Sequence, residues 1–97
     1  MKTEKIQLGH VVATPNALRA LESSGETPFA FLERHQNGDW GNVCHDDRQS
    51  NDLAVIDGSR ILSVYATRLG EKILIITEAE ANDGNRAATT ILLPADY

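Results

Sequence analysis

The chain has 97 residues, of which 41% are apolar and 24% are charged, and its formal net charge is −5. This length supports one domain rather than two, and the ordinary composition argues against global disorder. The excess of acidic residues disfavours general binding to nucleic acid or to an anionic membrane, because both depend on Lys and Arg. We therefore expect one folded domain over residues 1–97 whose partner is a protein.

Cys44 is the single cysteine of the chain. One cysteine permits neither an internal disulfide nor a zinc site built from several thiolates, and it fits a reducing compartment. Residues 1–7 lack the apolar core of a signal peptide, and the longest apolar runs, residues 73–76 and 91–93, are too short to cross a bilayer. We expect a cytoplasmic protein that uses no metal and no cofactor.

The first third of the chain predicts one strand and two helices. Apolar and polar residues alternate over residues 5–12, which indicates a strand, although Gly9 weakens it. Thr14-Pro15 and Thr27-Pro28 both look like helix starts, because Thr caps free amides and Pro suits the first helical position. Gly25 and Asn37-Gly38 are the corresponding stops.

The remainder changes from helical to strand-like periodicity. A glycine-flanked corner over residues 38–41 precedes a polar helix over residues 44–55, and Asp57-Gly58 indicates a turn. Three alternating apolar segments joined by short loops then predict an antiparallel meander, at residues 61–67, 72–79 and 88–93.

These elements predict an α+β fold in which an N-terminal strand and a helical hairpin pack on a C-terminal antiparallel sheet of three or four strands. Residues 73–76 are apolar on both faces, which is typical of a central strand. Helices would cover one face of it. The other face would be covered by the rest of the chain or by a second copy, so a homodimer through the sheet stays open.

Several motifs along the chain resemble one group of bacterial proteins. The matching blocks are Ala13-Thr14-Pro15, Phe31-Leu32-x-x-His35-x-x-Gly38-Asp39-Trp40-Gly41, Gly58-x-Arg60-Ile61-Leu62-Ser63-x-Tyr65, Lys72-Ile73-x-Ile75-Ile76-Thr77-Glu78-Ala79 and Ala88-Thr89-Thr90-Ile91-Leu92-Leu93-Pro94. The chain resembles small plasmid-related proteins of plasmids and integrating elements. The resemblance implies a setting on a mobile genetic element and names no activity. Residues 80–85 lengthen a tip that is a very tight turn in the similar proteins.

His35, Asp39 and Trp40 form the first candidate constellation. A histidine four residues before an aspartate, across a helix end, could pair its imidazole with the carboxylate and act as a general base. The structural alternative places His35 at the negative end of the helix dipole and lets Asp39 bond its own turn. Trp40 would fill the joint between the helices and the sheet, and we favour this alternative.

Cys44-His45-Asp46-Asp47 suggests metal or thiol chemistry at first sight. Adjacent residues do not easily reach one ion, and the spacing matches no zinc pattern. A nucleophilic Cys44 would need a base close in space. We expect Cys44 to be a small buried residue, with the two aspartates in the first turn of a helix.

The third constellation holds basic residues and threonines of the predicted sheet. Glu78 and Arg86 would form a cross-strand ion pair at the surface. Alternatively, Arg60, Arg86, Thr89 and Thr90 would form a small anion site, since the Arg guanidinium matches carboxylate and phosphate groups. The binding candidates are Trp40, Arg60, Glu78, Arg86 and Thr89.

Three function classes remain from the sequence. The favoured one is a non-enzymatic accessory protein of a mobile element that acts by protein–protein contacts, because no catalytic signature is present. The second is a small ribonuclease-like toxin or hydrolase that uses His35, Asp39 and Arg86. The third is an anti-restriction decoy, which would require one continuous acidic face.

Overall fold

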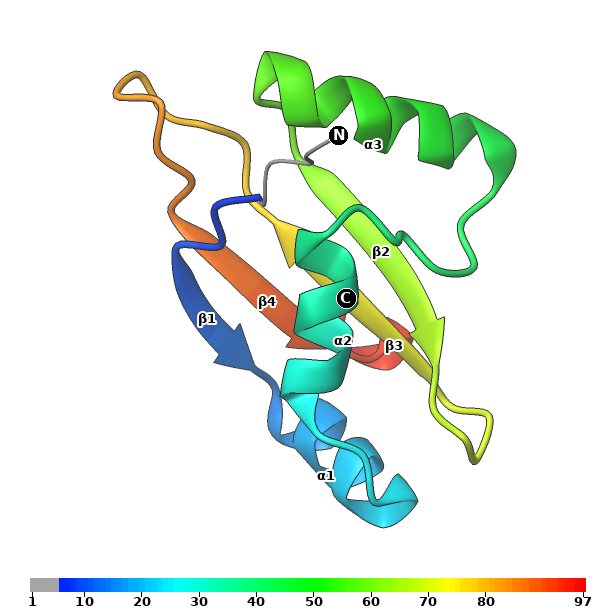
Figure 1. The fold of residues 1–97 in the computed structure, drawn as a ribbon. Coiled ribbons are helices and arrows are strands. Elements are labelled where there is room, and N and C mark those ends of the chain that lie inside the picture. The colour runs from blue at the N-terminus through cyan, green and yellow to red at the C-terminus, as the bar shows by residue number, and fades with distance from the viewer. Residues whose placement is uncertain (1–5) are drawn as a thin grey trace.

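The computed structural model of the chain describes residues 6–97 and shows three α-helices with one four-stranded sheet (Figure 1). The α+β class is therefore confirmed. The elements in chain order are β1 (His10–Ala13), α1 (Pro15–Ser24), α2 (Pro28–Gln36), α3 (His45–Asp57), β2 (Ile61–Ala66), β3 (Lys72–Thr77), β4 (Ala88–Leu92) and the short 3₁₀ helix η1 (Pro94–Asp96).

The sheet has the strand order β1-β4-β3-β2. The antiparallel meander is confirmed, with Ile61 opposite Thr77 and Ile75 opposite Ile91. Its short connections enforce this direction. Strand β1, in contrast, pairs in parallel with β4, so the sheet is mixed rather than wholly antiparallel. Most of the chain separates β1 from β4, and no tight turn fixes their relative direction.

Strand β1 begins at His10, later than the expected residues 5–12. Gly9 has a φ of 66°, which interrupts an extended run, and a Cβ at this position would overlap the carbonyl oxygen of Arg86. A glycine is therefore needed where the chain passes closely over the start of β4. Residues 6–8 are not in a strand, and Lys5 lies outside the described residues.

The predicted helix signals for α1 and α2 are confirmed in atomic detail. The Thr14 hydroxyl accepts the Ala17 N–H at 3.1 Å, and the Thr27 hydroxyl accepts that of Ala30 at 3.4 Å. Gly25 ends α1 in the left-handed conformation with a φ of 73°. Local chemistry thus fixes where both helices start, and a glycine fixes where the first one stops.

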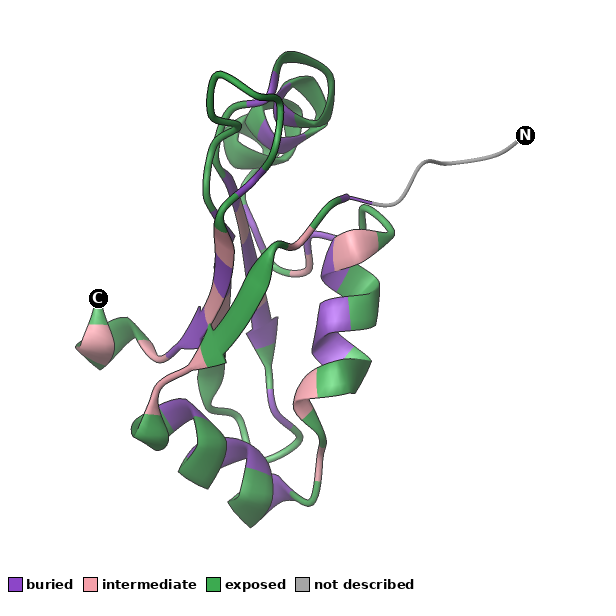
Figure 2. Cartoon of the chain, turned by 90° about the vertical axis from the view of Figure 1, so that its left-hand side faces the viewer, coloured by how far each residue is buried: buried purple, intermediate pink, exposed green. Residues whose placement is uncertain are grey.

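Helix α3 lies at one end of the sheet, whereas α1 lies at the opposite end and α2 lies along one face (Figures 1 and 2). The main core joins Leu21 of α1 and Phe31 of α2 to Tyr65, Ile75 and Ile91 of the sheet. A second cluster surrounds Trp40 near α3. Over residues 6–97, every helix falls short of the length and apolarity that a membrane span requires.

Candidate functional site

A buried line of polar side chains crosses the middle of the sheet. His35 on α2 has no exposed surface, and its two ring nitrogens contact Ser63 Oγ on β2 at 2.6 Å and Thr77 Oγ1 on β3 at 2.8 Å. Thr77 Oγ1 contacts Thr89 Oγ1 on β4 at 2.8 Å. The Thr89 hydroxyl donates to the carbonyl oxygen of Leu8 at 2.7 Å, so one line joins α2 to the chain preceding β1.

The last acceptor in this line determines the direction of every hydrogen bond. A carbonyl only accepts, so Thr89 uses its single proton on Leu8 and must accept from Thr77. Thr77 has then spent its proton and must accept from His35 Nε2–H. In a neutral imidazole the Nδ1 atom then carries no proton and accepts from the Ser63 hydroxyl. The line therefore places the single proton of the neutral imidazole on Nε2.

The environment of His35 makes it a poor general base at neutral pH. Burial and, to a smaller extent, the positive charge of Arg86 together lower the pKa of His35 from 6.5 to about 4. Both ring nitrogens are already engaged, and no part of the side chain reaches solvent. The imidazole acts as a polar cross-link between α2 and the sheet.

Asp39 is directed away from His35. Its carboxylate accepts from Arg34 Nε at 2.7 Å and from the Gly41 N–H at 3.2 Å, and the Arg34 bond lowers the pKa of the Asp39 carboxyl. Arg34 also lies 4.5 Å from the centroid of the Tyr65 ring. Asp39 thus holds the corner after α2, and the imidazole–carboxylate pair considered for catalysis is not formed.

Trp40 fills the joint between α3 and the sheet. Only 2% of its surface is exposed, and it packs in a cluster with Ile6, Ala54 and Ile61. Its indole N–H donates to Asp52 Oδ1 on α3 at 2.9 Å, and its ring meets that of His35 edge to face. Trp40 therefore fills the joint between the helices and the sheet, as the sequence predicts.

Arg86 is buried, with 5% of its surface exposed, and does not bond the Glu78 carboxylate. Its guanidinium donates to the carbonyl oxygens of Ser59 at 2.7 Å, Ala54 at 2.9 Å and Glu78 at 3.0 Å. Ala54 belongs to the last turn of α3, at the negative end of the helix dipole, and its carbonyl oxygen also accepts the Gly58 N–H at 2.9 Å. Arg86 therefore caps α3 and ties it to the sheet.

The anion site considered for the sheet is not assembled. Arg60 is exposed and donates to the Tyr97 hydroxyl at 3.3 Å, whereas Arg86 is enclosed and Thr89 belongs to the His35 line. Cys44 is exposed at the N-cap of α3, which corrects the expectation that it is buried. No three His, Cys, Asp or Glu side chains within residues 6–97 are arranged to hold a metal ion.

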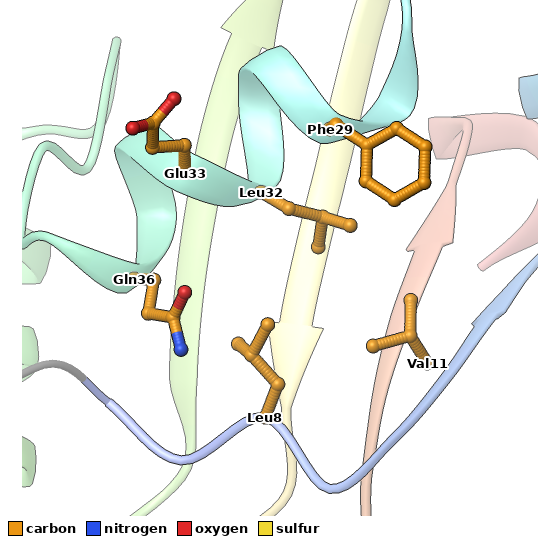
Figure 3. Close-up of a pocket in the computed structure, with 6 residues that line it drawn as sticks. All are labelled: Leu8, Val11, Phe29, Leu32, Glu33 and Gln36. Carbon is orange, nitrogen blue, oxygen red and sulfur yellow. The ribbon is translucent and has the colours of Figure 1, made fainter.

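A surface groove was not predicted from the sequence. It has a volume of about 430 Å³ and lies between β1 and α2 (Figure 3). Its lining residues are Leu8, Val11, Phe29, Leu32, Glu33 and Gln36. Phe29 is 77% exposed although it is one of only two phenylalanines in the chain. An exposed aromatic side chain beside an apolar groove is typical of an interaction site rather than of a core.

The two edges of the sheet differ in whether their outward backbone groups are paired. At the β2 edge, the Asn51 side chain bonds both the N–H and the carbonyl of Leu62, and residues 40–42 bond both groups of Val64. At the β1 edge, the His10 and Thr14 amides bond carbonyls on the β4 side at 2.9 Å. Alternation then turns the Val11 and Ala13 amides away from β4, where no strand among residues 6–97 pairs with them.

This open edge and the groove lie on the same side of the molecule. Figure 2 looks directly at β1, with α2 beside it and the space between them facing the viewer. The sequence gives only a weak signal for this site, namely a phenylalanine directly after the proline at a helix start. Searches of the chain against protein-family models, curated proteins and solved structures find no match.

Proposed function

We propose that this chain is a non-enzymatic accessory protein that acts by protein–protein contacts, and that its contact site is the groove together with the open β1 edge. The observation that supports this most directly is the contrast between the two edges. Unpaired strand edges attract other chains, and folded proteins usually cover them. Here the β2 edge is covered by a dedicated asparagine, whereas β1 is left open beside an exposed phenylalanine.

A partner bound here would gain two kinds of interaction. The backbone groups of Val11 and Ala13 would pair with an extended segment, which is the common mode of strand addition. The apolar groove would receive alternate side chains of that segment. The setting on a mobile genetic element remains part of the proposal and rests on the resemblance of the sequence motifs alone.

The enzyme alternative receives less support from the geometry. A toxin or hydrolase that uses His35 needs an imidazole that substrate can reach, and this imidazole is enclosed and neutral. Arg86, its suggested cationic partner, has its guanidinium committed to three carbonyls. The surface groove offers apolar contacts and backbone groups, which suit recognition better than bond cleavage.

The proposal is tested by photocrosslinking in the cells that naturally carry the protein. A benzophenone amino acid replaces Phe29 in one variant and Ile56 in the other. Ile56 is the matched control, because it is 84% exposed on α3, away from the groove. We expect a discrete partner to be captured from position 29 and not from position 56. Equal capture from both positions, or none from position 29, would contradict the proposal.

A second pair of variants tests whether that capture depends on the groove. Val11 and Val12 are adjacent valines, both 41% exposed, whose side chains point to opposite faces of the sheet. Val11→Lys places a charge in the groove, whereas Val12→Lys places the same charge on the far face. We expect Val11→Lys to reduce capture roughly tenfold, because disrupting a binding hot spot costs about 1–2 kcal/mol. Val12→Lys should leave capture unchanged.

A second copy of the chain is the alternative occupant of the edge. Light scattering of the purified protein distinguishes it, because a homodimer would double the mass in the absence of any partner. A dimer that Val11→Lys converts to a monomer would identify the edge as a self-association surface and would contradict the accessory role proposed here.

A further inference from the structure

The open edge of β1 restricts the shape of whatever binds it. The N–H and carbonyl groups of Val11 and Ala13, with which no strand of residues 6–97 pairs, repeat at the spacing of a strand, so they match an extended backbone better than a helix. In an added strand, alternate side chains point toward the face that α2 covers. These side chains would point toward the groove, since Val11 of the same strand lines it (Figure 3).

The groove has an apolar part and an acidic part at a defined spacing. Phe29 lies near Val11, whereas Glu33 lies one helical turn further along α2 (Figure 3). Four residues advance about 6 Å along a helix axis, and alternate residues of a strand are about 6.7 Å apart. An added strand that follows the groove would thus present two successive inward side chains to the neighbourhoods of Phe29 and Glu33, which both line it.

We propose that the β1 edge binds an extended protein segment in which an apolar and a basic residue stand two positions apart. The inference rests on the proposed function and adds the chemistry of the partner. The apolar side chain packs against Phe29 and Val11, and the Lys or Arg side chain pairs with the Glu33 carboxylate. The net charge of −5 also favours a positively charged partner.

A second copy of this chain fits the groove less well. In a continuous sheet that keeps its helices on one face, the copy would present Val11 and Ala13 toward the groove. Neither residue is basic, and two chains of charge −5 would meet. Charge complementarity therefore favours a different protein over self-association.

The test uses synthetic ten-residue peptides with serine and threonine flanks. Their centre is isoleucine, threonine and a variable residue, which is lysine, glutamine or glutamate. Both orders of the central residues are made, because parallel and antiparallel strands present them in opposite order. Binding is followed by NMR on the full-length protein. We expect the Val11 and Ala13 amides to shift, and the lysine peptide of one order to bind roughly three- to tenfold more tightly than the glutamate peptide.

A charge reversal assigns this preference to one residue. In the Glu33→Lys variant, the glutamate peptide should bind more tightly than the lysine peptide. The matched control is Glu71→Lys, which changes the net charge equally at an exposed position in the turn between β2 and β3, away from the groove. If both variants alter the preference equally, the attraction comes from overall charge and the inference is wrong.

Other outcomes separate the inference from the proposed function. Peptides that shift the β1 amides with equal affinity for lysine and glutamate would overturn the partner chemistry and leave the docking site intact. Peptides that leave the β1 amides unshifted would overturn the inference, and position 29 would then have to capture a partner for the proposed function to survive.

Discussion

Acidification is expected to destabilise the fold through His35. In the unfolded chain the imidazole takes up a proton with an ordinary pKa of 6.5, whereas in the folded protein this pKa is about 4. Between these values the unfolded state binds more protons, so stability falls as the pH falls. The His35 contribution is unaffected above the unfolded pKa, and its loss is complete below the folded pKa.

The size of the effect follows from the shift in pKa. One pKa unit corresponds to about 1.4 kcal/mol, so the change from 6.5 to about 4 gives about 3 kcal/mol in full. At a pH of about 4.5 most of this loss, roughly 2–3 kcal/mol, should already be present. His35 has no exposed surface, so solvent does not screen the effect. A loss of this size is a large part of the stability of a small domain, which is about 5–10 kcal/mol.

Urea unfolding measures this loss, with the fluorescence of the buried Trp40 as the signal. The free energy of unfolding is determined at a pH of about 7.5 and again at about 4.5, for the wild type and for His35→Gln. Hydrogen bonds lower the carboxyl pKa values of Asp39 and Asp96, so protonation of these groups also destabilises the fold in acid. The wild type and His35→Gln share that loss. The difference between the two proteins isolates His35.

Equal losses in the wild type and His35→Gln would refute this reasoning. A second measurement needs no variant. The NMR signals of the His35 imidazole should stay constant between pH of about 7.5 and 5.5, with the tautomer that carries its proton on Nε2. A shift of these signals with a midpoint near the ordinary histidine pKa would show that the folded protein accepts the proton at little cost.

Three further predictions concern residues that hold the architecture. Arg86→Met should lower the free energy of unfolding by about 3–5 kcal/mol in urea titrations, because three buried carbonyls lose the guanidinium, although that of Ala54 keeps the Gly58 N–H. An effect below about 1 kcal/mol would show that Arg86 does not tie α3 to the sheet. Gly41→Ala should lower the free energy of unfolding by more than about 2 kcal/mol, because the new Cβ would overlap the Val64 carbonyl oxygen. Gly70→Ala has open space around it and should lower this free energy by only about 1 kcal/mol, because of its positive φ. Thermal unfolding of the two variants compares them, and equal midpoints would contradict this. Thr77→Val should cost about 2–4 kcal/mol in the same measurement, because it leaves the His35 Nε2–H without its acceptor and the Thr89 oxygen without its donor. A neutral result would exclude the line of hydrogen bonds.

The candidate site could be predicted only in part from the sequence. The burial of Trp40 followed from its being the one tryptophan beside a glycine corner, and the structure agrees. Arg86 was expected to pair with the Glu78 carboxylate, but it bonds backbone carbonyls instead. Backbone carbonyls leave no trace in the sequence, because every residue carries one. The partners of a buried cation are therefore visible only in three dimensions.

Local chemistry determined the boundaries of the elements. The Thr-Pro pairs, the glycines at helix ends and the alternation over the three C-terminal strands act within a few residues, so the sequence alone predicts α1, α2 and the meander β2-β3-β4. Three other features join residues of different elements: the parallel pairing of β1, the cap of Asn51 on the β2 edge and the line from Ser63 to Leu8. Such contacts depend on how the layers pack, and only the tertiary structure decided that β1 would be the open edge beside Phe29.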